Sequence, residues 1–310
     1  MPKLMRKRAL LAKIESSYGT DPTPTGAANA ILLKNLELTP IAATTVSRDL
    51  IRPYLGGFDQ LIADTHVEVT FEVEMAASGA AGTAPAYGPL LRACGFSETI
   101  NASTSVVYTP VSSSFESVTI YVNYDGVQHK ITGCYGSLDV DITAKQIPVY
   151  KFKMVGKYNA PTDVALPTAV YTGFVSPLLA NNTNTTPFSF LSITTLSLQS
   201  LKLSINNSVD FRALIGSEYT QITDRQMNGN VQFESPALAT LNIFSNAVGI
   251  VTGALSITHG TVAGNKVAFA MTKIDVGQPT YSDSNGVVMI DCPVNILPTS
   301  GNDEMTITLT

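Results

Sequence analysis

Histidine, the residue that acid-base and metal chemistry recruit most often, is scarce in this sequence. The chain has three histidines, His66, His129 and His259, in three separate segments expected to be strands or turns. A catalytic or metal site would need several such groups to converge. Because no pattern predicts that they gather, we interpret the histidines as isolated residues on the surface of a sheet.

Paired carboxylates are stronger chemical candidates. Glu72 and Glu74 are two residues apart, as are Asp139 and Asp141, so each pair points to one side of a strand. A glycosidase uses two such acids, so a hydrolase acting through Glu72 and Glu74 is one hypothesis. The same spacing arises on any strand with one face in water, and we favour that interpretation. The sequence contains no GxSxG, P-loop, HExxH or EF-hand pattern.

Several arginines are candidates for holding subunits together. Arg52 and Arg212 each precede apolar residues and a glycine, at residues 52–56 and 212–216. An arginine in such a loop can form a bidentate pair with a carboxylate of a neighbouring subunit, and a bridge within the chain fits equally well. Four residues are therefore candidate anchors between subunits: Arg48, Arg52, Arg212 and Arg225.

The elements expected to position these residues are mainly β-strands. From His66 to Met75, apolar residues alternate strictly with polar and acidic ones, which predicts a strand with one buried and one acidic face. Asp125-Gly126 separates two β-like segments and predicts a tight hairpin. Residues 41–64 form an unusually long connection, which suggests a functional loop.

Composition excludes several classes of protein. Only 14% of the 310 residues are charged, against roughly 25% in an ordinary soluble domain. The net charge of −5 argues against a nucleic-acid-binding protein, which usually carries a basic patch. Cys94, Cys134 and Cys292 match neither a disulfide framework nor a metal motif, so no cofactor or metal is expected. The chemistry of the surface favours protein partners.

The N-terminal segment suggests neither export nor membrane insertion. Residues 1–8 are basic, but Lys13 and Glu15 interrupt the apolar stretch that follows. No apolar run approaches the ~18 residues of a membrane span. We therefore expect synthesis in the cytoplasm and no insertion into a membrane.

The order of short motifs predicts that the second half of the chain restates the first; the alternative is two β domains that share only strand composition. Residues 36–39, 52–56 and 69–72 recur in order as residues 201–204, 212–216 and 231–234, and a helix-like segment follows each set, at residues 89–95 and 236–246. The fold prediction is mainly β: two tandem β-sandwich or barrel domains, each with one short flanking helix, plus long loops and an extended N-terminal arm. The predicted divisions are an arm over residues 1–30, a first domain over 31–160, a linker over 161–190 and a second domain over 191–310.

Several segments resemble the major tail tube proteins of long-tailed bacteriophages with non-contractile tails. The resemblance is sharpest at residues 11–15, 18–22 and 82–96, and the second half contributes residues 212–216 and 301–304. It implies a structural, non-enzymatic virion protein that forms stacked rings, and a tube through which genomic DNA leaves the capsid. The implied partners are further copies of the chain and the tail terminator, tape-measure and tail-tip proteins.

The repeat bears on the stoichiometry that this resemblance implies. Two tube domains per chain predict rings of three chains with pseudo-sixfold symmetry; the alternative is a hexamer whose second domain decorates the outside. An acidic lumen would repel phosphates, so that DNA passes without binding. The candidate lumen residues are Glu68, Glu72, Glu74, Asp139 and Asp141. A carbohydrate-binding or adhesive β-protein of a virion or cell surface is the alternative function, although the sequence has no tryptophan for stacking on sugars.

Overall fold

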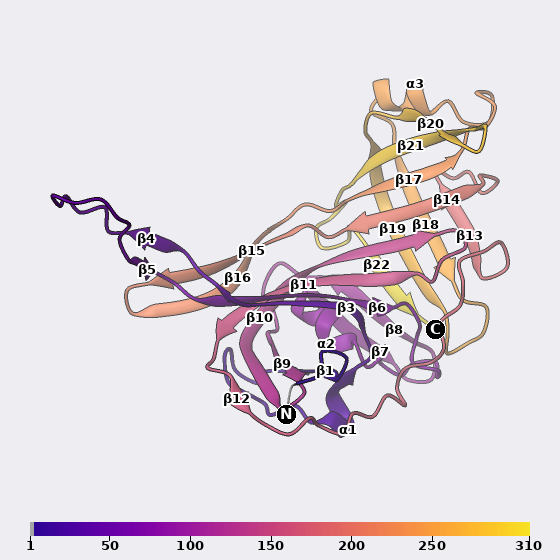
Figure 1. Ribbon diagram of the computed structural model, residues 1–310. Coiled ribbons are helices and arrows are strands. Elements are labelled where there is room, and N and C mark those ends of the chain that lie inside the picture. Colours follow the sequence, from indigo (N-terminus) through magenta and orange to yellow (C-terminus); the bar gives the residue numbers. More distant parts are fainter. Residues whose placement is uncertain (1–2) are drawn as a thin grey trace.

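The computed structural model describes residues 3–310 and is built mainly from antiparallel β-strands (Figure 1). The elements of the first half are, in chain order, β1 (Arg8–Ile14), α1 (Gly26–Asn29), β2 (Ala30–Ile31), β3 (Lys34–Ala42), β4 (Thr45–Ser47), β5 (Gln60–Ile62), β6 (His66–Glu74), α2 (Gly88–Ala93), β7 (Phe96–Asn101), β8 (Ser105–Pro110), β9 (Val118–Tyr124), β10 (Val127–Thr143), β11 (Val149–Tyr158) and β12 (Thr162–Asp163).

The second half repeats the β-rich character of the first. Its elements are β13 (Thr185–Phe190), β14 (Leu198–Ser204), β15 (Asn207–Leu214), β16 (Ser217–Arg225), β17 (Asn228–Glu234), α3 (Ile243–Val248), β18 (Thr252–His259), β19 (Val267–Val276), β20 (Thr280–Ser284), β21 (Val287–Ile296) and β22 (Thr306–Leu309). The mainly β prediction is confirmed, with short helices after β6 and β17.

One row of eight strands crosses both halves. Its order is β3, β6, β11, β10, β14, β17, β21 and β20, and every neighbouring pair is antiparallel. The two halves meet in this row at β10 and β14, and a second pairing joins β8 to β22. The remaining paired strands curl this system into a barrel-like wall. We call the eight strands the central row.

A hydrophobic core lies behind the central row and runs through both halves. The alternation predicted for β6 is observed, since Val67, Val69, Phe71 and Val73 are buried. Phe71 packs on Phe152 with ring centroids 5.5 Å apart, and in the second half Phe233 packs on Phe190 at 5.7 Å. Pairs of this kind add about 0.5–1.5 kcal/mol beyond the burial of area. The apolar faces of the strands thus hold the row in place and leave its polar face outward.

Two hairpins project from the same side of the molecule in Figure 1. The β4–β5 arm, residues 43–65, connects β3 to β6, and the β15–β16 arm, residues 207–225, connects β14 to β17. Gly216 has φ of 90° at the tip of the second arm, a conformation that favours glycine in a tight turn. The long connection expected after the first strand is therefore the first arm. Nothing in our sequence interpretation anticipated the second hairpin.

The N-terminal segment differs from the expected extended arm. Arg8–Ile14 forms β1, which pairs along its length with β9 and places Leu10, Leu11 and Ala12 in the interior. Glu15 follows as a buried carboxylate that accepts hydrogen bonds from Ser117 Oγ, Thr119 Oγ1 and two backbone N–H groups. Because these donors satisfy both side-chain oxygens, Glu15 can close the end of β1 inside the fold.

Other differences concern element boundaries. The strand after the Asp125-Gly126 turn is long: β10 continues to Thr143, with a bulge between Thr132 and Tyr135. The predicted hairpin at Asp125-Gly126 is confirmed between β9 and β10. The helix expected at residues 236–246 lies instead at Ile243–Val248, because the Asn242 side chain accepts a hydrogen bond from Ser245 N and caps its start.

Candidate functional site

The five predicted acidic residues all lie on the outward face of the central row. Glu72 in β6 lies opposite Lys151 in β11, which in turn lies opposite Asp139 in β10. Side chains of directly opposed residues share a face of the sheet. The same registers place the remaining candidates, Glu68, Glu74 and Asp141, on that face. Residues from two separate predicted segments are thus brought together by β11.

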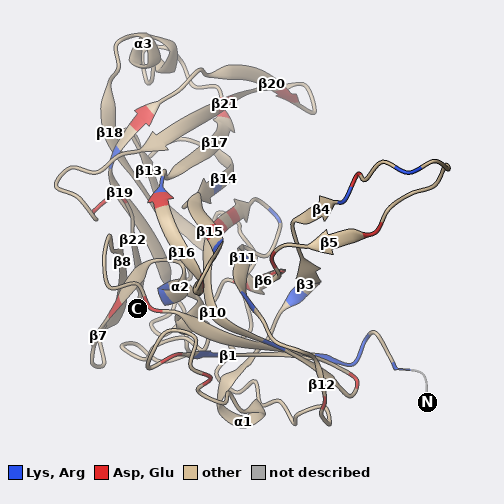
Figure 2. Cartoon of the chain, turned by 90° about the vertical axis from the view of Figure 1, so that its left-hand side faces the viewer, with Lys and Arg blue, Asp and Glu red and all other residues tan. Residues whose placement is uncertain are grey.

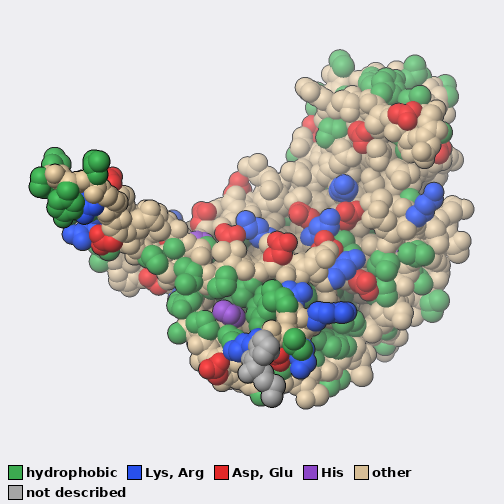
Figure 3. Space-filling view, in the orientation of Figure 1, with side chains coloured by type: hydrophobic (Ala, Val, Ile, Leu, Met, Phe, Trp, Pro, Cys, Tyr) green, Lys and Arg blue, Asp and Glu red, His purple; other side chains and the backbone are tan. Residues whose placement is uncertain are grey.

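Lysines interleave with these carboxylates. Lys153 Nζ lies 3.6 Å from Glu68 Oε2, Lys34 Nζ lies 4.0 Å from Glu72 Oε2, and Lys151 Nζ lies 3.0 Å from Asp141 Oδ2. In Figure 3, red and blue side chains mix across the middle of the molecule where it is hollowed. The face is therefore zwitterionic, and its acidic character is weaker than the carboxylates alone predicted.

Asp141 is the carboxylate on this face whose ionisation the structure perturbs most clearly. Partial burial disfavours its charged form, but hydrogen bonds from Thr143 and Lys151 outweigh burial and hold the pKa of Asp141 below its ordinary value. The bond to Asp141 also raises the pKa of Lys151. This pair stays charged at neutral pH, so the face keeps separated positive and negative charges.

The face continues into the second half with few charges. Across β14 and β17, Lys202 lies opposite Asn230, and Ser200 lies opposite Gln232. Gln232 Nε2 donates to Ser282 Oγ of β20 at 3.3 Å. The neutral amides and hydroxyls of this half leave the central row polar from one edge to the other.

The β4–β5 arm carries two of the four candidate arginines. Arg48 Nη1 lies 3.3 Å from Asp59 Oδ2, across the arm. Arg52 lies over the rings of Tyr54 and Phe58, with its Cζ 4.7 and 4.2 Å from their centroids. Both contacts are within the chain and stiffen the arm. The charged segments along it are visible in Figure 2.

The tip of this arm carries several apolar side chains that are exposed to solvent. Its exposed apolar residues are Leu50, Ile51, Tyr54 and Leu55. Clustered exposed apolar side chains on a projecting hairpin indicate a contact surface for another protein. We call these four residues the apolar tip.

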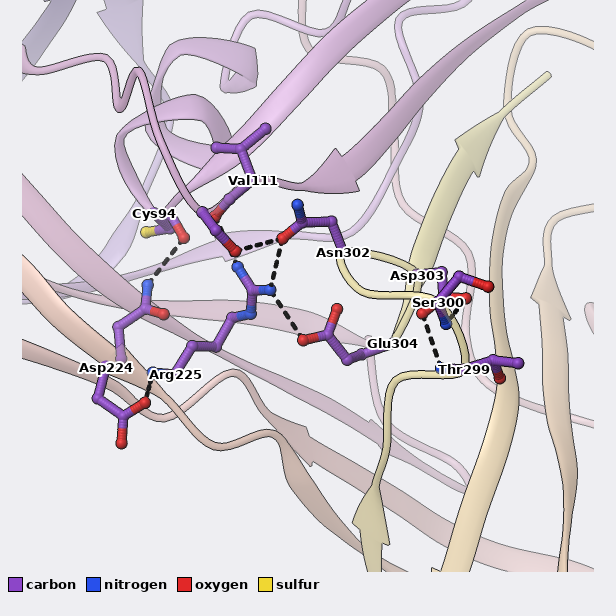
Figure 4. Close-up of polar contacts among 11 residues, drawn as sticks. Cys94, Val111, Asp224, Arg225, Thr299, Ser300, Asn302, Asp303 and Glu304 are labelled. Atoms are coloured by element: carbon purple, nitrogen blue, oxygen red, sulfur yellow. Dashed lines mark hydrogen bonds and ion pairs between the residues drawn. The ribbon is translucent and has the colours of Figure 1, made fainter.

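Arg225 and Arg212 occupy different environments on the β15–β16 arm. Arg225 Nη2 donates to Glu304 Oε1 at 2.8 Å, and its Nη1 donates to Val111 O at 2.7 Å (Figure 4). Arg212 is exposed, and within residues 3–310 it forms no ion pair. Arg225 therefore anchors the base of its own arm to the first half and to the C-terminal loop.

Asn207 anchors the other strand of the same arm base. Its side-chain amide donates to Cys94 O at 2.8 Å and to Gly136 O at 2.9 Å. Asn207 and Arg225 lie opposite one another in the β15–β16 pair. Both strands of the arm are thus clamped at their root, so its direction is set by the body of the molecule.

The catalytic alternatives receive no geometric support. His66, His129 and His259 lie on β6, β10 and β18 and do not converge. Within residues 3–310, no three His, Cys, Asp or Glu side chains are grouped to hold a metal ion. Burial raises the pKa of the Cys292 thiol to about 12, which leaves it protonated and unreactive at neutral pH.

Comparison with known protein families shows to which family this chain belongs. A family model described as phage tail tube protein matches residues 5–310, nearly the whole chain. The chain belongs to the phage tail tube protein family. It is accordingly a structural component of a bacteriophage tail and not an enzyme. No curated protein matches the sequence significantly.

The tail tube assignment favours the structural interpretation over the carbohydrate-binding one. Among the described residues, no helix is both long and apolar enough to cross a bilayer.

The sequence analysis missed the lysines of β11 and the polar strand β20 as parts of the site. The alternation of Lys151 and Lys153 with buried neighbours was the available signal for the first.

Proposed function

We propose that this tail tube protein assembles into stacked rings whose inner wall is the central row, as in a long, non-contractile tail. The observation that carries the proposal is the continuous polar face of eight paired strands, backed by one core. A wall lining an aqueous channel needs a polar side with its backbone groups paired and an apolar side for stability. The central row has both.

The charge pattern of this face suits passage of DNA without retention. Tight binding to DNA comes from lysines and arginines that neutralise phosphates. Here Lys34, Lys151 and Lys153 are each within 4.0 Å of a carboxylate, which reduces their attraction for phosphate. The candidate lumen carboxylates therefore act as partners of lysines as well as a source of repulsion. We expect weak, non-specific contact with the genome during ejection.

We further propose that the chain is a duplication and that three copies form a ring. In each half, a strand, a projecting arm and a second strand occur in the same order: β3, β4–β5, β6 and β14, β15–β16, β17. Phe71 and Phe233 are both buried on the second strand, while Glu72 and Glu234 follow them on the polar face. A bulge also interrupts both pairings near these phenylalanines.

The structural register refines the sequence repeat. Leu38 lies opposite Val69, and Leu201 lies opposite Val231. The sequence repeat matches Leu201 to Leu36. If Val69 and Val231 are equivalent, Leu201 corresponds instead to Leu38. Insertions at bulges move the register without changing the buried face. The matched strand registers support the proposal that the two halves occupy equivalent positions in a ring wall.

The arms are proposed to join adjacent rings. The apolar tip of the β4–β5 arm lies far from the body in Figure 1, where it can reach another ring. Burying Ile51 and Leu55, both fully exposed, would stabilise a contact by about 1.5–3 kcal/mol per side chain. Tail terminator, tape-measure and tail-tip proteins are the proposed partners at the tube ends and in the lumen.

Electron microscopy of the concentrated protein, with tail-initiating proteins supplied, tests this function. We expect tubes whose cross-section has three repeats, each corresponding to one chain of 32.9 kDa. Particles that remain monomeric under these conditions would contradict tube formation. A cross-section with six identical chains would contradict the duplicated ring while leaving the tube itself intact.

A further inference from the structure

The tip of the β4–β5 arm is folded with its charge inside and its apolar side chains outside. Arg52 is half-buried, whereas its neighbour Ile51 and the nearby Leu55 are fully exposed. Apolar side chains usually occupy the interior of a fold, and arginines usually lie at the surface. Because Ile51 and Leu55 are not buried, their packing cannot be what holds the tip in shape.

Strand pairing does not hold this tip either. The last directly opposed residues of the arm are Ser47 and Gln60, and residues 48–59 lie beyond them. Among the described residues, no backbone hydrogen bond joins two members of that segment. The β15–β16 arm differs, because its pairing continues to Leu214 and Ser217 on either side of the turn. The shape of the first tip therefore depends on side chains.

Arg52 supplies most of these side-chain contacts. Its guanidinium lies over two rings, with Cζ 4.7 Å from the Tyr54 centroid and 4.2 Å from the Phe58 centroid. Its Nη2 donates a hydrogen bond to Gly57 O at 2.7 Å. A planar guanidinium can stack on rings while its edge donates, which a lysine ammonium cannot do. One side chain thus connects both sides of the turn. We call Arg52, Tyr54 and Phe58 the arginine cluster.

Gly56 leaves the room that the arginine cluster needs. It has φ of 147°, and a Cβ at this position would lie only 2.8 Å from Arg52 Nη2. The second arm has the same spacing from arginine to glycine, but Arg212 is exposed within β15. Leu214 stands where the first arm has Tyr54, so one of the two rings is missing there. The arginine cluster is a feature of the first arm.

We propose that Arg52 is a positioning residue that sets the apolar tip in its docking conformation before another ring is reached. This inference rests on the proposed joining of rings by the arms and deepens it. A loop that must become ordered on contact weakens that contact, because only the competent fraction of chains can bind. The arginine cluster orders the tip in advance and keeps Ile51 and Leu55 exposed for the partner.

Two substitutions of Arg52 test the proposal in the free chain. Arg52→Met keeps an unbranched side chain without charge or donors, and Arg52→Lys keeps the charge without the planar group. In the unmodified protein, backbone 15N relaxation should show residues 50–58 to be as ordered as β4 and β5. Both variants should lose that order, while the Tm stays within about 2 °C because the tip lies outside the core. Unchanged order in both variants would overturn the proposal.

Tube assembly provides the second measurement. The critical concentration for tubes, followed by light scattering and checked by electron microscopy, should rise about tenfold in both variants, because the competent fraction is smaller. The matched control is Arg6→Met, which removes an exposed arginine outside both arms and should leave the critical concentration unchanged. Arg52 variants that assemble like this control would overturn the proposal.

A double variant separates positioning from direct contact with the next ring. Phe58→Leu removes one ring of the arginine cluster and should raise the critical concentration as Arg52→Met does. If both substitutions act through one conformation of the tip, the double variant should be little worse than either single one. Effects that multiply would place Arg52 in the contact itself and overturn its positioning role.

The outcomes separate this inference from the proposed function. Unmodified protein that forms no tubes would contradict the function, and relaxation of the free chain would still decide whether Arg52 orders the tip. Tubes that form normally from a chain whose tip is disordered by Arg52→Met would overturn the inference and leave the function intact.

Discussion

The ion pair at the root of the β15–β16 arm offers the most quantitative test of the structure. Arg225 and Glu304 each expose only 11% of their side chain, and Arg225 also donates to Val111 O. Hydrogen bonds to charged groups contribute about 1.5–3 kcal/mol each. Replacing Arg225 with Met removes its side-chain hydrogen bonds to Val111 O, Asn302 Oδ1 and Glu304 Oε1 and leaves the Glu304 carboxylate buried. Breaking a buried pair in this way costs about 3–5 kcal/mol.

This cost should appear as a lower free energy of unfolding and a lower melting temperature. Because larger chains lose about 2 °C per kcal/mol, Arg225→Met should lower the Tm by roughly 6–10 °C. Differential scanning calorimetry measures the shift, and urea titration measures the change in free energy of unfolding. The matched control is Arg212→Met on the same arm, which should change stability by less than about 0.5 kcal/mol because Arg212 is exposed.

A double-mutant cycle separates the pair from its surroundings. Glu304→Gln keeps the shape of the side chain but removes its charge, and the double variant should be less destabilised than the sum of the single ones. We expect a coupling energy of about 1–3 kcal/mol. A loss below 1 kcal/mol for Arg225→Met, or additive single effects, would refute the assignment of this pair as the anchor of the arm.

Three further predictions concern the core, the arm and the polar face. Phe71→Ala and Phe233→Ala should each cost about 3–5 kcal/mol of unfolding free energy in urea titrations, and a loss in only one half would argue against equivalent core positions. Replacing residues 49–58 with a short Gly-Asn turn should leave the Tm of the free chain within about 2 °C, while electron microscopy shows no stacked tubes; normal tubes would exclude a role of the apolar tip. Asp141 has a lowered folded pKa, so its pair with Lys151 stabilises the fold above the unfolded value of about 3.9, and this contribution is lost as pH falls through the folded pKa. Asp141→Asn should therefore be less stable than the unchanged protein at pH 7, and the difference should shrink as the pH falls below the unfolded value; a difference that does not change with pH would contradict the lowered pKa.

Local patterns in the sequence predicted the elements that depend mainly on neighbouring residues. The alternation in β6, the Asp125-Gly126 hairpin and the helix near residues 88–93 were all correct, because side-chain period, turn chemistry and proline placement act over a few residues. The N-terminal strand was missed for the opposite reason. Its residues show no clear alternation, and only pairing with β9, more than 100 residues away, makes Leu10 and Leu11 interior.

The candidate site divides in the same way. The acidic positions of β6 and β10 followed from residue spacing, but their pairing with Lys34, Lys151 and Lys153 depends on which strands become neighbours. Arg225 was named from sequence as a candidate anchor between subunits, whereas its contacts in the structure lie within the chain. Its partner Glu304 is 79 residues further along the chain and comes close only through the C-terminal loop.

The sequence by itself determined that this protein is a β-rich chain whose strands alternate polar and apolar faces. Those properties depend on periodicity, composition and short motifs, which need no knowledge of the fold. Only the tertiary structure decided that one row of eight strands carries the polar face through both halves, from β3 at one end to β20 at the other. Strand order and register are set by burial of distant apolar faces against one another, and that long-range packing leaves no local mark in the sequence.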